Sequence, residues 1–249
     1  AETAGDGLRT YHLTGSPLRE FAFLTSTSYL STETQALGVT VRSFYLPGDE
    51  AAGQAALNTA AAALRVYDDA FGAYPYPELI VVEAPLRFYG MEYPGLNLLG
   101  MGLYRDQRQE LEVRVAHEIA HQWWYSQVGS DQVNTPWLDE GLTENSVATY
   151  YRQVYGEARA NTYVNQQWLV PYQLAVENGQ DAVVNQPAAA FGPEYEVMVY
   201  AKAALFFDAL RQQVGDETYR EILRQYLARF RWRIAAPDDF LRVAESVSG

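Results

Sequence analysis

The sequence contains no cysteine, which excludes disulfides, thiol catalysis and zinc sites built from cysteine. It has only three histidines, and Lys202 is its only lysine, so imidazole and ammonium chemistry can occur at very few positions. No apolar run approaches the roughly 20 residues that a helix needs to cross a bilayer. The opening AETAGDGLRT also lacks the charged and apolar regions of a signal peptide. We therefore expect a soluble domain, and the compartment, cytoplasmic or exported, stays open.

The composition is that of a globular protein. Hydrophobic residues make up 48% and charged residues 20% of the 249 positions, enough for the core of one large domain. The 18 basic and 31 acidic residues give a net charge of −13, which argues against nucleic acid or an anionic membrane surface as a partner. The acidic charge is compatible with two roles, attraction of substrates with a positive amino end and plain solubility.

Two of the three histidines lie in the segment HEIAH. His117 and His121 are four residues apart, so on a helix their imidazoles project from one face, one turn apart. Glu118 follows the first histidine. This arrangement is typical of zinc hydrolases, with two imidazoles on the metal and a carboxylate that acts as general base on its water. The alternative interpretation is an ordinary helix whose histidines have common hydrogen-bond partners and whose glutamate is solvated.

A third ligand is expected from the segment WLDEG. Glu140 is separated from His121 by eighteen residues and lies in a stretch that also reads as a helix. Packed on the first helix, this second helix would bring the Glu140 carboxylate to the metal and leave a fourth position open for water, as in catalytic zinc sites. One Zn²⁺ per chain is therefore the expected cofactor, and it would lower the pKa of its water towards about 7.

Ligand histidines usually donate their second ring nitrogen to a carboxylate or a carbonyl. Asp139 and Glu144 are close enough to Glu140 in sequence to serve in this way, and Glu144 lies one helical turn beyond it. The alternative, which explains the two residues equally well, is that both are ordinary solvated charges on the helix surface.

Four segments together resemble a known family. HEIAHQWW, the eighteen-residue gap to WLDEG, YGMEYPG at positions 89–95 and VYAKAALFF at positions 199–207 are similar to the zinc aminopeptidases. That family includes membrane alanyl aminopeptidase, bacterial aminopeptidase N and leukotriene hydrolase, which are gluzincins. The order and spacing agree over about positions 39–249. The resemblance implies a thermolysin-like catalytic domain that hydrolyses the N-terminal peptide bond of peptides with a free N-terminus, using a zinc-activated water.

The resemblance also implies a second catalytic residue. Tyr200, in VYAKAALFF, matches the family tyrosine whose hydroxyl stabilises the oxyanion of the tetrahedral intermediate. With 19 tyrosines in the chain, only the match to the motif singles this one out. Ala203 stands where the family usually has glycine, and Tyr195 is expected nearby as part of the pocket.

The substrate contacts implied by the resemblance lie in YGMEYPG. Glu92 matches the glutamate that pairs with the substrate's α-ammonium group and thereby selects the first peptide bond. The backbone around Gly90 and Met91 is expected to hold the peptide like an added strand. Tyr89 and Tyr93 replace the first glycine and the final asparagine of the family pattern, so the wall of the pocket must differ.

The expected fold class is α+β, with a small sheet followed by a mostly helical region. Residues 1–46 are predicted to be strands leading in, a possible remnant of an N-terminal β-domain, and residues 47–249 the catalytic domain. Strands are expected at 18–24, 38–45 (with a slip in its alternation) and 78–84. A helix is expected to open within 47–50 and to be stopped by Gly72 and the prolines that follow it. Further helices are expected at about 107–127, 136–155, 157–176, 196–214, 216–230 and 237–247.

Three functions are compared on this basis. The first is a zinc aminopeptidase domain that works with other domains of a parent protein. The second is another zinc hydrolase on the same scaffold, such as an endopeptidase, which would still cleave a substrate whose N-terminus is acetylated. A variant of the first is a fragment that is inactive without its neighbouring domains. The third is a non-catalytic interaction domain, which the presence of every ligand, the base and the tyrosine disfavours.

Overall fold

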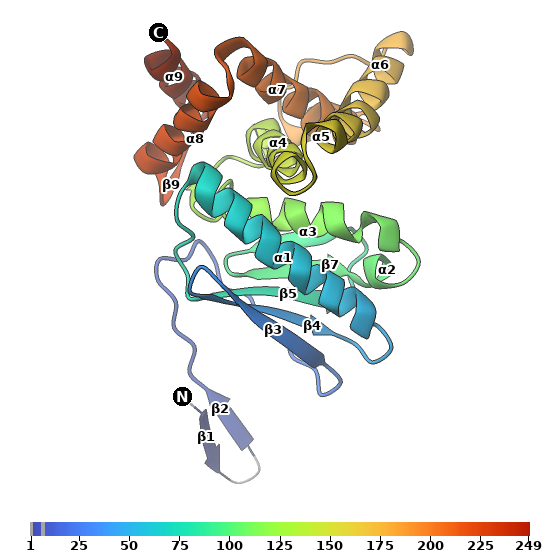
Figure 1. Ribbon diagram of the computed structural model, residues 1–249, viewed down its shortest axis with the longest axis vertical. Coiled ribbons are helices and arrows are strands. Elements are labelled where there is room, and N and C mark those ends of the chain that lie inside the picture. The colour runs from blue at the N-terminus through green and yellow to red at the C-terminus, as the bar shows by residue number, and fades with distance from the viewer. Residues whose placement is uncertain (1, 6–7) are drawn as a thin grey trace.

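The computed structural model describes residues 2–5 and 8–249 of the chain. At its centre is a five-stranded sheet with the strand order β3-β4-β5-β7-β6, which occupies the lower half of Figure 1. The strands β4, β5 and β7 run parallel, and β3 and β6 run antiparallel to them at the two edges. The five strands are β3 Leu30–Ala36, β4 Val39–Tyr45, β5 Glu78–Ala84, β6 Gly90–Tyr93 and β7 Leu96–Gly100.

Two short sheets lie outside this centre. β1 and β2 form an antiparallel hairpin, and β8 pairs with β9 in parallel. Their bounds are β1 Glu2–Gly5, β2 Leu8–Tyr11, β8 Val128–Gly129 and β9 Arg233–Ile234.

One face of the sheet is covered by two helices, α1 Glu50–Phe71 and α3 Leu111–Ala120 (Figure 1). Alternate residues of β4, from Val39 to Tyr45, point into this layer and are buried. The helix α1 approaches the strand closely at Gly53, where a Cβ atom would lie 2.0 Å from the ring of Tyr45. Glycine is therefore required at this position, since any side chain would push α1 away from the sheet.

The second half of the chain is helical. The helix α4 is buried over most of its length because α3, α5 and α7 pack around it. The main helices here are α4 Pro136–Tyr155, α5 Glu157–Val164, α6 Val170–Glu177, α7 Ala203–Val214, α8 Asp216–Phe230 and α9 Pro237–Ser248. Shorter elements are α2 Met101–Tyr104, η1 Arg108–Glu110, η2 Asn165–Leu169, η3 Ala188–Ala190 and η4 Val197–Lys202. Among the helices described, none has the length and hydropathy to span a membrane.

Two tryptophans after α3 join the sheet layer to the helices. The ring of Trp123 makes an edge contact with Tyr67 of α1, at a centroid distance of 5.8 Å. The ring of Trp124 lies 6.0 Å from Tyr226 of α8 in a stacked arrangement. Both side chains are fully buried, so one continuous core holds the end of α3 against both layers.

The α+β fold class is confirmed, and the predicted helices of the second half form. The end predicted for the helix at about 107–127 is wrong. The helix α3 ends at Ala120 instead of near residue 127. The N–H groups of Gln122 and Trp123 bond to carbonyls only three residues back, which tightens the last turn. Turns at residues 121–127 follow and lead to β8, and both tryptophans lie buried within them.

The strand predicted at residues 18–24 is also wrong. Within residues 2–5 and 8–249 this segment pairs with no strand, and Phe21 and Phe23 are 61% and 71% exposed. The strand that pairs with β4 is β3, whose only fully buried residue is Ala36, so its sequence carries no apolar alternation. The alternation of β4 shows no slip. The boundary expected between residues 46 and 47 stays a prediction, although β3 and β4 share one sheet with β5.

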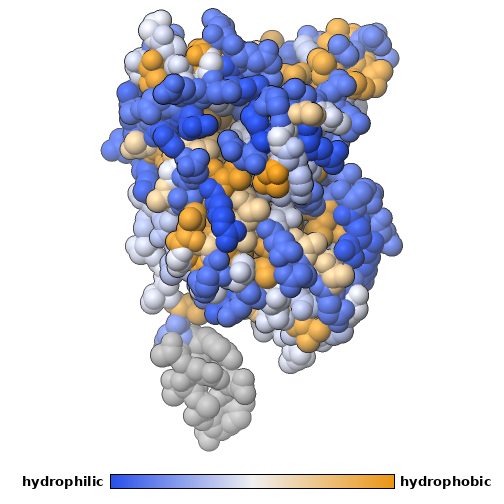
Figure 2. Space-filling model, viewed as in Figure 1, coloured by the Kyte–Doolittle hydropathy of each residue, from blue (hydrophilic) through white to orange (hydrophobic). Residues whose placement is uncertain are grey.

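The surface seen in Figure 2 is mostly hydrophilic, as expected for a chain with a net charge of −13. An apolar area lies at the upper right of that view, over α6. Exposed large side chains there are Leu169, Val170, Leu174 and Val176.

Candidate metal centre and active-site cleft

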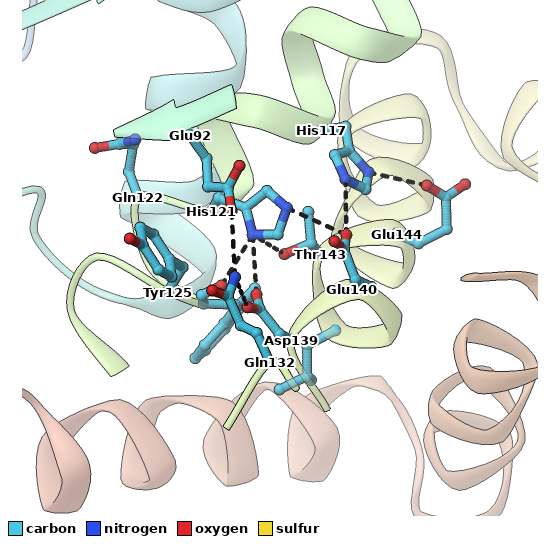
Figure 3. Close-up of polar contacts among 12 residues, drawn as sticks. Glu92, His117, His121, Gln122, Tyr125, Gln132, Asp139, Glu140, Thr143 and Glu144 are labelled. Carbon is cyan, nitrogen blue, oxygen red and sulfur yellow. Dashed lines mark hydrogen bonds and ion pairs between the residues drawn. The ribbon is translucent and has the colours of Figure 1, made fainter. Parts of the chain in front are cut away.

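Three side chains converge where α3 meets α4 (Figure 3). His117 projects from α3, His121 caps the end of that helix with helical backbone angles, and Glu140 lies in α4. The Nε2 atom of each histidine lies 3.3 Å from Oε2 of Glu140. One ligand atom from each residue falls within 4.8 Å of the other two. The structure therefore brings together the three residues that the motifs nominate as ligands.

The orientation of His117 is set by a carboxylate. Its Nδ1 lies 3.0 Å from Oε2 of Glu144, one turn beyond Glu140 on α4. The other oxygen of Glu144 accepts hydrogen bonds from the Tyr163 hydroxyl and, at 2.9 Å, from the Trp168 indole N–H. Because a carboxylate only accepts, Nδ1 of His117 carries a proton, so Nε2, which faces Glu140, is the nitrogen that can bind a metal once it is deprotonated.

The orientation of His121 is set by several oxygens. Its Nδ1 lies 3.0 Å from the carbonyl oxygen of Trp124, from the Thr143 hydroxyl and from Oδ1 of Asp139. A carbonyl oxygen only accepts, so this Nδ1 also carries the proton. Gln132 donates a 2.7 Å hydrogen bond to the second oxygen of Asp139 and holds that carboxylate in place.

These contacts fit a zinc ion. Two imidazole nitrogens that lose their proton to a metal and one carboxylate oxygen, all within reach of one point, are the donor set of a catalytic zinc site with an open position. Burial alone would lower the pKa of His117, but its hydrogen bonds to Glu140 and Glu144 raise that pKa to about 9. Burial alone would raise the pKa of Glu140, yet its hydrogen bonds with both histidines lower it. The pocket thus favours positive charge, which a divalent cation supplies.

Glu118 lies beside this triad in a buried position. Its Oε2 has no hydrogen-bond partner in the described part of the chain. Burial raises the pKa of Glu118 to about 7, although the charges of His117 and His121 act to lower it. A Cβ atom at Gly90 would lie 2.1 Å from Oε1 of Glu118, so only glycine leaves room for this carboxylate. The pKa is suited to a group that accepts and returns a proton near neutrality.

Tyr200 reaches the same cleft from η4. Its ring lies 5.8 Å from the His117 ring, nearly parallel to it, and Tyr195 packs edge-on at 6.2 Å. Burial, together with the charge of Glu140, raises the pKa of Tyr200 well above its usual value, so the hydroxyl keeps its proton. The departure from the family pattern at Ala203 is accommodated by Gly141 of α4, where a Cβ atom would lie 2.6 Å from that of Ala203.

The cleft around these groups has a volume of about 780 Å³. Gly90, Met91 and Glu92 line it from β6, the edge strand, which pairs with β7 on one side only. Glu92 is 8% exposed, and its Oε1 lies 3.3 Å from the Gln132 amide that also holds Asp139. The three substrate-side residues predicted from the motif therefore face the predicted metal ligands across one cavity.

Several supporting residues were not predicted. Thr143 lies one turn after Glu140 on α4, a spacing that could have nominated it. Gln132 comes from a loop, Tyr163 and Trp168 come from later helices, and Trp124 contributes only its carbonyl. No local pattern reports such contacts, because each depends on how distant segments pack.

The family model described as the peptidase family M1 domain matches residues 55–249. Alanine/arginine aminopeptidase of Saccharomyces cerevisiae is 25% identical over 245 residues, covering 87% of this chain and 27% of the relative. Aminopeptidase M1-C of Oryza sativa subsp. japonica is 25% identical over 267 residues, covering 100% of this chain and 30% of the relative. The chain thus spans less than a third of the length of these curated relatives.

Solved structures show the same fold. An M1 zinc metallopeptidase from Deinococcus radiodurans superposes with a TM-score of 0.67 at 22% identity, covering 89% of this chain and 49% of that one. A mutant of a two-domain M1 zinc metallopeptidase bound to L-arginine gives a TM-score of 0.68 at 21% identity, covering 88% and 49%. At these identities the likeness speaks for the fold alone.

Proposed function

The chain belongs to peptidase family M1, as a zinc aminopeptidase domain, and we propose that its own cleft hydrolyses the first peptide bond of peptides with a free N-terminus. The observation that carries this proposal is the Glu92 carboxylate, which lines the same cavity as His117, His121 and Glu140. A carboxylate placed there can pair with the α-ammonium group of a peptide and bring the first peptide bond to the metal ligands.

Glu118 is proposed as the general base. A zinc ion held by the triad would act as a Lewis acid on a water molecule and on the scissile carbonyl. Glu118 has a buried carboxylate oxygen without a partner among the described residues and a pKa of about 7. It can therefore take the proton of the attacking water and return it to the amine that leaves.

Tyr200 is proposed as the donor to the oxyanion. Its raised pKa keeps the phenol protonated at neutral pH, and its ring is held against His117 beside the ligands. A hydroxyl aimed at the developing negative charge stabilises a transition state of this kind by on the order of 3 kcal/mol.

The direction of the bound peptide follows from β6. Gly90 lies against Glu118, and Glu92 lies two residues further along the strand, towards Gln132. A peptide with its amine at Glu92 and its first peptide bond at Glu118 would run antiparallel to β6. The free edge of β6 can then bind the peptide backbone as an added strand.

Product analysis by mass spectrometry tests this function. One mixed peptide pool is offered to zinc-loaded protein with free and with acetylated N-termini. We expect single residues to be lost from the free peptides only. Internal cuts in both pools would contradict the aminopeptidase function and leave zinc hydrolysis standing.

A Glu92→Gln variant tests the amine anchor. We expect kcat/KM for free peptides to fall by about 10–100-fold, because a neutral amide replaces the negatively charged acceptor of the α-ammonium group, with zinc content unchanged. Retention of the wild-type rate would remove Glu92 from the mechanism.

We also propose that further parts of the parent protein complete the substrate site, since the chain spans less than a third of its curated relatives. A comparison of kcat/KM between this chain and the parent protein checks this. Equal values would show that the domain is sufficient.

A further inference from the structure

One wall of the cleft holds a positively charged group that the proposed chemistry does not use. Arg114 lies on α3, one turn before Glu118, and Tyr89 directly precedes β6; both line the cavity. The guanidinium carbon of Arg114 lies 4.1 Å from the centre of the Tyr89 ring, a close cation–π contact. Tyr89 is one of the two residues of this segment that depart from the family pattern.

Within the described residues, the guanidinium group of Arg114 has a donor without a hydrogen-bond partner. Its Nε is buried and has no hydrogen-bond partner among the residues that the structure describes. Within the same residues, no carboxylate lies at ion-pair distance from its guanidinium. Arg105, by contrast, pairs with both Asp49 and Glu83. A planar guanidinium fixed over a ring and facing a cavity is preorganised for a carboxylate ligand.

The charges in the cleft single out this position. Of the residues that line it, Glu92, Glu118, Glu140 and Glu196 are acidic, and Arg87 and Arg114 are the arginines. Arg87 is an exposed residue of the loop before β6, whereas Arg114 stands on the helix that carries the metal ligands. A carboxylate that enters this acidic cavity therefore meets a fixed cation at Arg114.

The order of residues along β6 and α3 places Arg114 relative to the substrate. Tyr89 lies against Arg114, Gly90 lies against Glu118, and Glu92 lies further along in the same direction. If the amine is at Glu92 and the first peptide bond at Glu118, as the proposed function has it, the residue after the cleaved bond lies towards Tyr89 and Arg114.

We propose that Arg114 binds a carboxylate on the residue that follows the cleaved bond, with Tyr89 as the positioning residue that holds the guanidinium. The carboxylate has two sources, the side chain of an acidic second residue and the C-terminus of a dipeptide. This inference rests on the proposed function, because the N-terminal amine at Glu92 sets the register of the peptide.

Matched substrates test the preference. Amidated tripeptides share their first and third residues and carry Glu, Gln or Lys in second place. A dipeptide with Gln second is compared as free acid and as amide, which separates the two sources. We expect kcat/KM for the Glu peptide to exceed that of the Gln peptide by about tenfold, mainly through KM, because an ionic hydrogen bond forms. We expect the free acid to exceed its amide in the same way if the C-terminus also reaches Arg114.

Variants locate the preference. Arg114→Gln should remove the difference between the Glu and Gln peptides, and Arg114→Lys should retain part of it. Tyr89→Ala should weaken it through KM, and Tyr89→Phe should restore it, because the ring is kept. The matched control is Arg108→Gln, which removes the same charge from an exposed residue outside the cleft and should leave the preference intact.

Binding provides a second measurement that needs no turnover. Zinc-loaded Glu118→Gln protein, with and without Arg114→Gln, is titrated calorimetrically with the Glu and Gln tripeptides. Equal affinities for both peptides, or a preference that survives Arg114→Gln, would overturn the inference. If the protein releases no single residue from any peptide but still binds the Glu peptide more tightly through Arg114, the proposed function fails and the carboxylate site stands.

Discussion

The two histidines of the metal site are held in different ways. His117 depends on one carboxylate, Glu144, whose other oxygen is held by Tyr163 and Trp168 from the helices that follow α4. Among the described residues, its Nδ1 has this buried carboxylate as its single acceptor. Loss of that acceptor leaves the imidazole with no group that selects its tautomer.

His121 has three oxygens at 3.0 Å from Nδ1, and one of them is the backbone carbonyl of Trp124. No side-chain substitution removes that carbonyl, so the tautomer of His121 is protected against the loss of Thr143 or Asp139. The two histidines of the motif therefore differ: one side chain holds the tautomer of His117, whereas several oxygens hold that of His121.

The largest expected effect separates catalysis from metal binding. Glu118→Gln should lower kcat by about 10²–10⁴-fold, because the amide cannot accept the proton of the attacking water. Zinc content should equal that of the wild type, since Glu118 is not one of the three residues that could hold the metal. Stopped-flow or steady-state rates combined with metal analysis check this. A mutant of near wild-type rate would refute the role of general base.

The next largest effect is expected from removing the carboxylate that accepts from Nδ1 of His117. Glu144→Gln should weaken zinc binding by about 10–100-fold, because the amide is a poorer acceptor for Nδ1–H and lowers the basicity of Nε2. Competition with a zinc chelator at fixed pH measures the affinity. Glu177→Gln, at an exposed position at the end of α6, is the matched control and should bind zinc as the wild type does.

A smaller effect is expected one step further from the metal. Trp168→Phe removes the indole N–H that donates to Glu144, and the unfolding free energy should fall by about 1.5–3 kcal/mol, as for a hydrogen bond to a charged group. Zinc affinity should fall less than in Glu144→Gln. Urea unfolding measures the stability, with Trp232→Phe at a partly exposed position as control. Equal losses in both variants would show that the hydrogen bond to Glu144 contributes nothing.

The smallest effect is expected at Thr143, beside His121, and it tests the difference between the two histidines. Thr143→Val removes one of the three oxygens near Nδ1 of His121 and keeps the shape of the side chain. Stability should fall by about 1 kcal/mol, and zinc affinity should change far less than in Glu144→Gln, since the Trp124 carbonyl still accepts the proton. If chelator competition finds the two variants equally weakened, the redundancy around His121 does not exist.

The success of the sequence-based predictions depended on how local their signals were. The helices after Pro136 and the strand at residues 78–84 follow from periodicity and from proline and glycine boundaries, and they form where expected. The errors at residues 18–24 and 121–127 came from apolar segments that read as regular elements. Phe21 and Phe23 lie in a segment that pairs with no strand in the described part of the chain, and Trp123 and Trp124 are buried in turns beyond the end of α3.

For the site, local spacing nominated His117, His121 and Glu140, and neighbouring positions on α4 made Asp139 and Glu144 candidate acceptors. That Glu144 lies beside His117 and Asp139 beside His121 depends on how α4 packs on α3. The contact between Arg114 and Tyr89 likewise depends on the packing of separate segments, so no local pattern predicts it.

The sequence by itself predicted the chemistry, because the ligands and the base lie in two short local patterns and Tyr200 lies in a third segment that resembles the family. Only the tertiary structure decided which nitrogen of each imidazole faces the metal and what lies across the cleft. Those features depend on a backbone carbonyl, a loop glutamine and side chains of later helices, whose positions follow from packing between segments far apart in the chain.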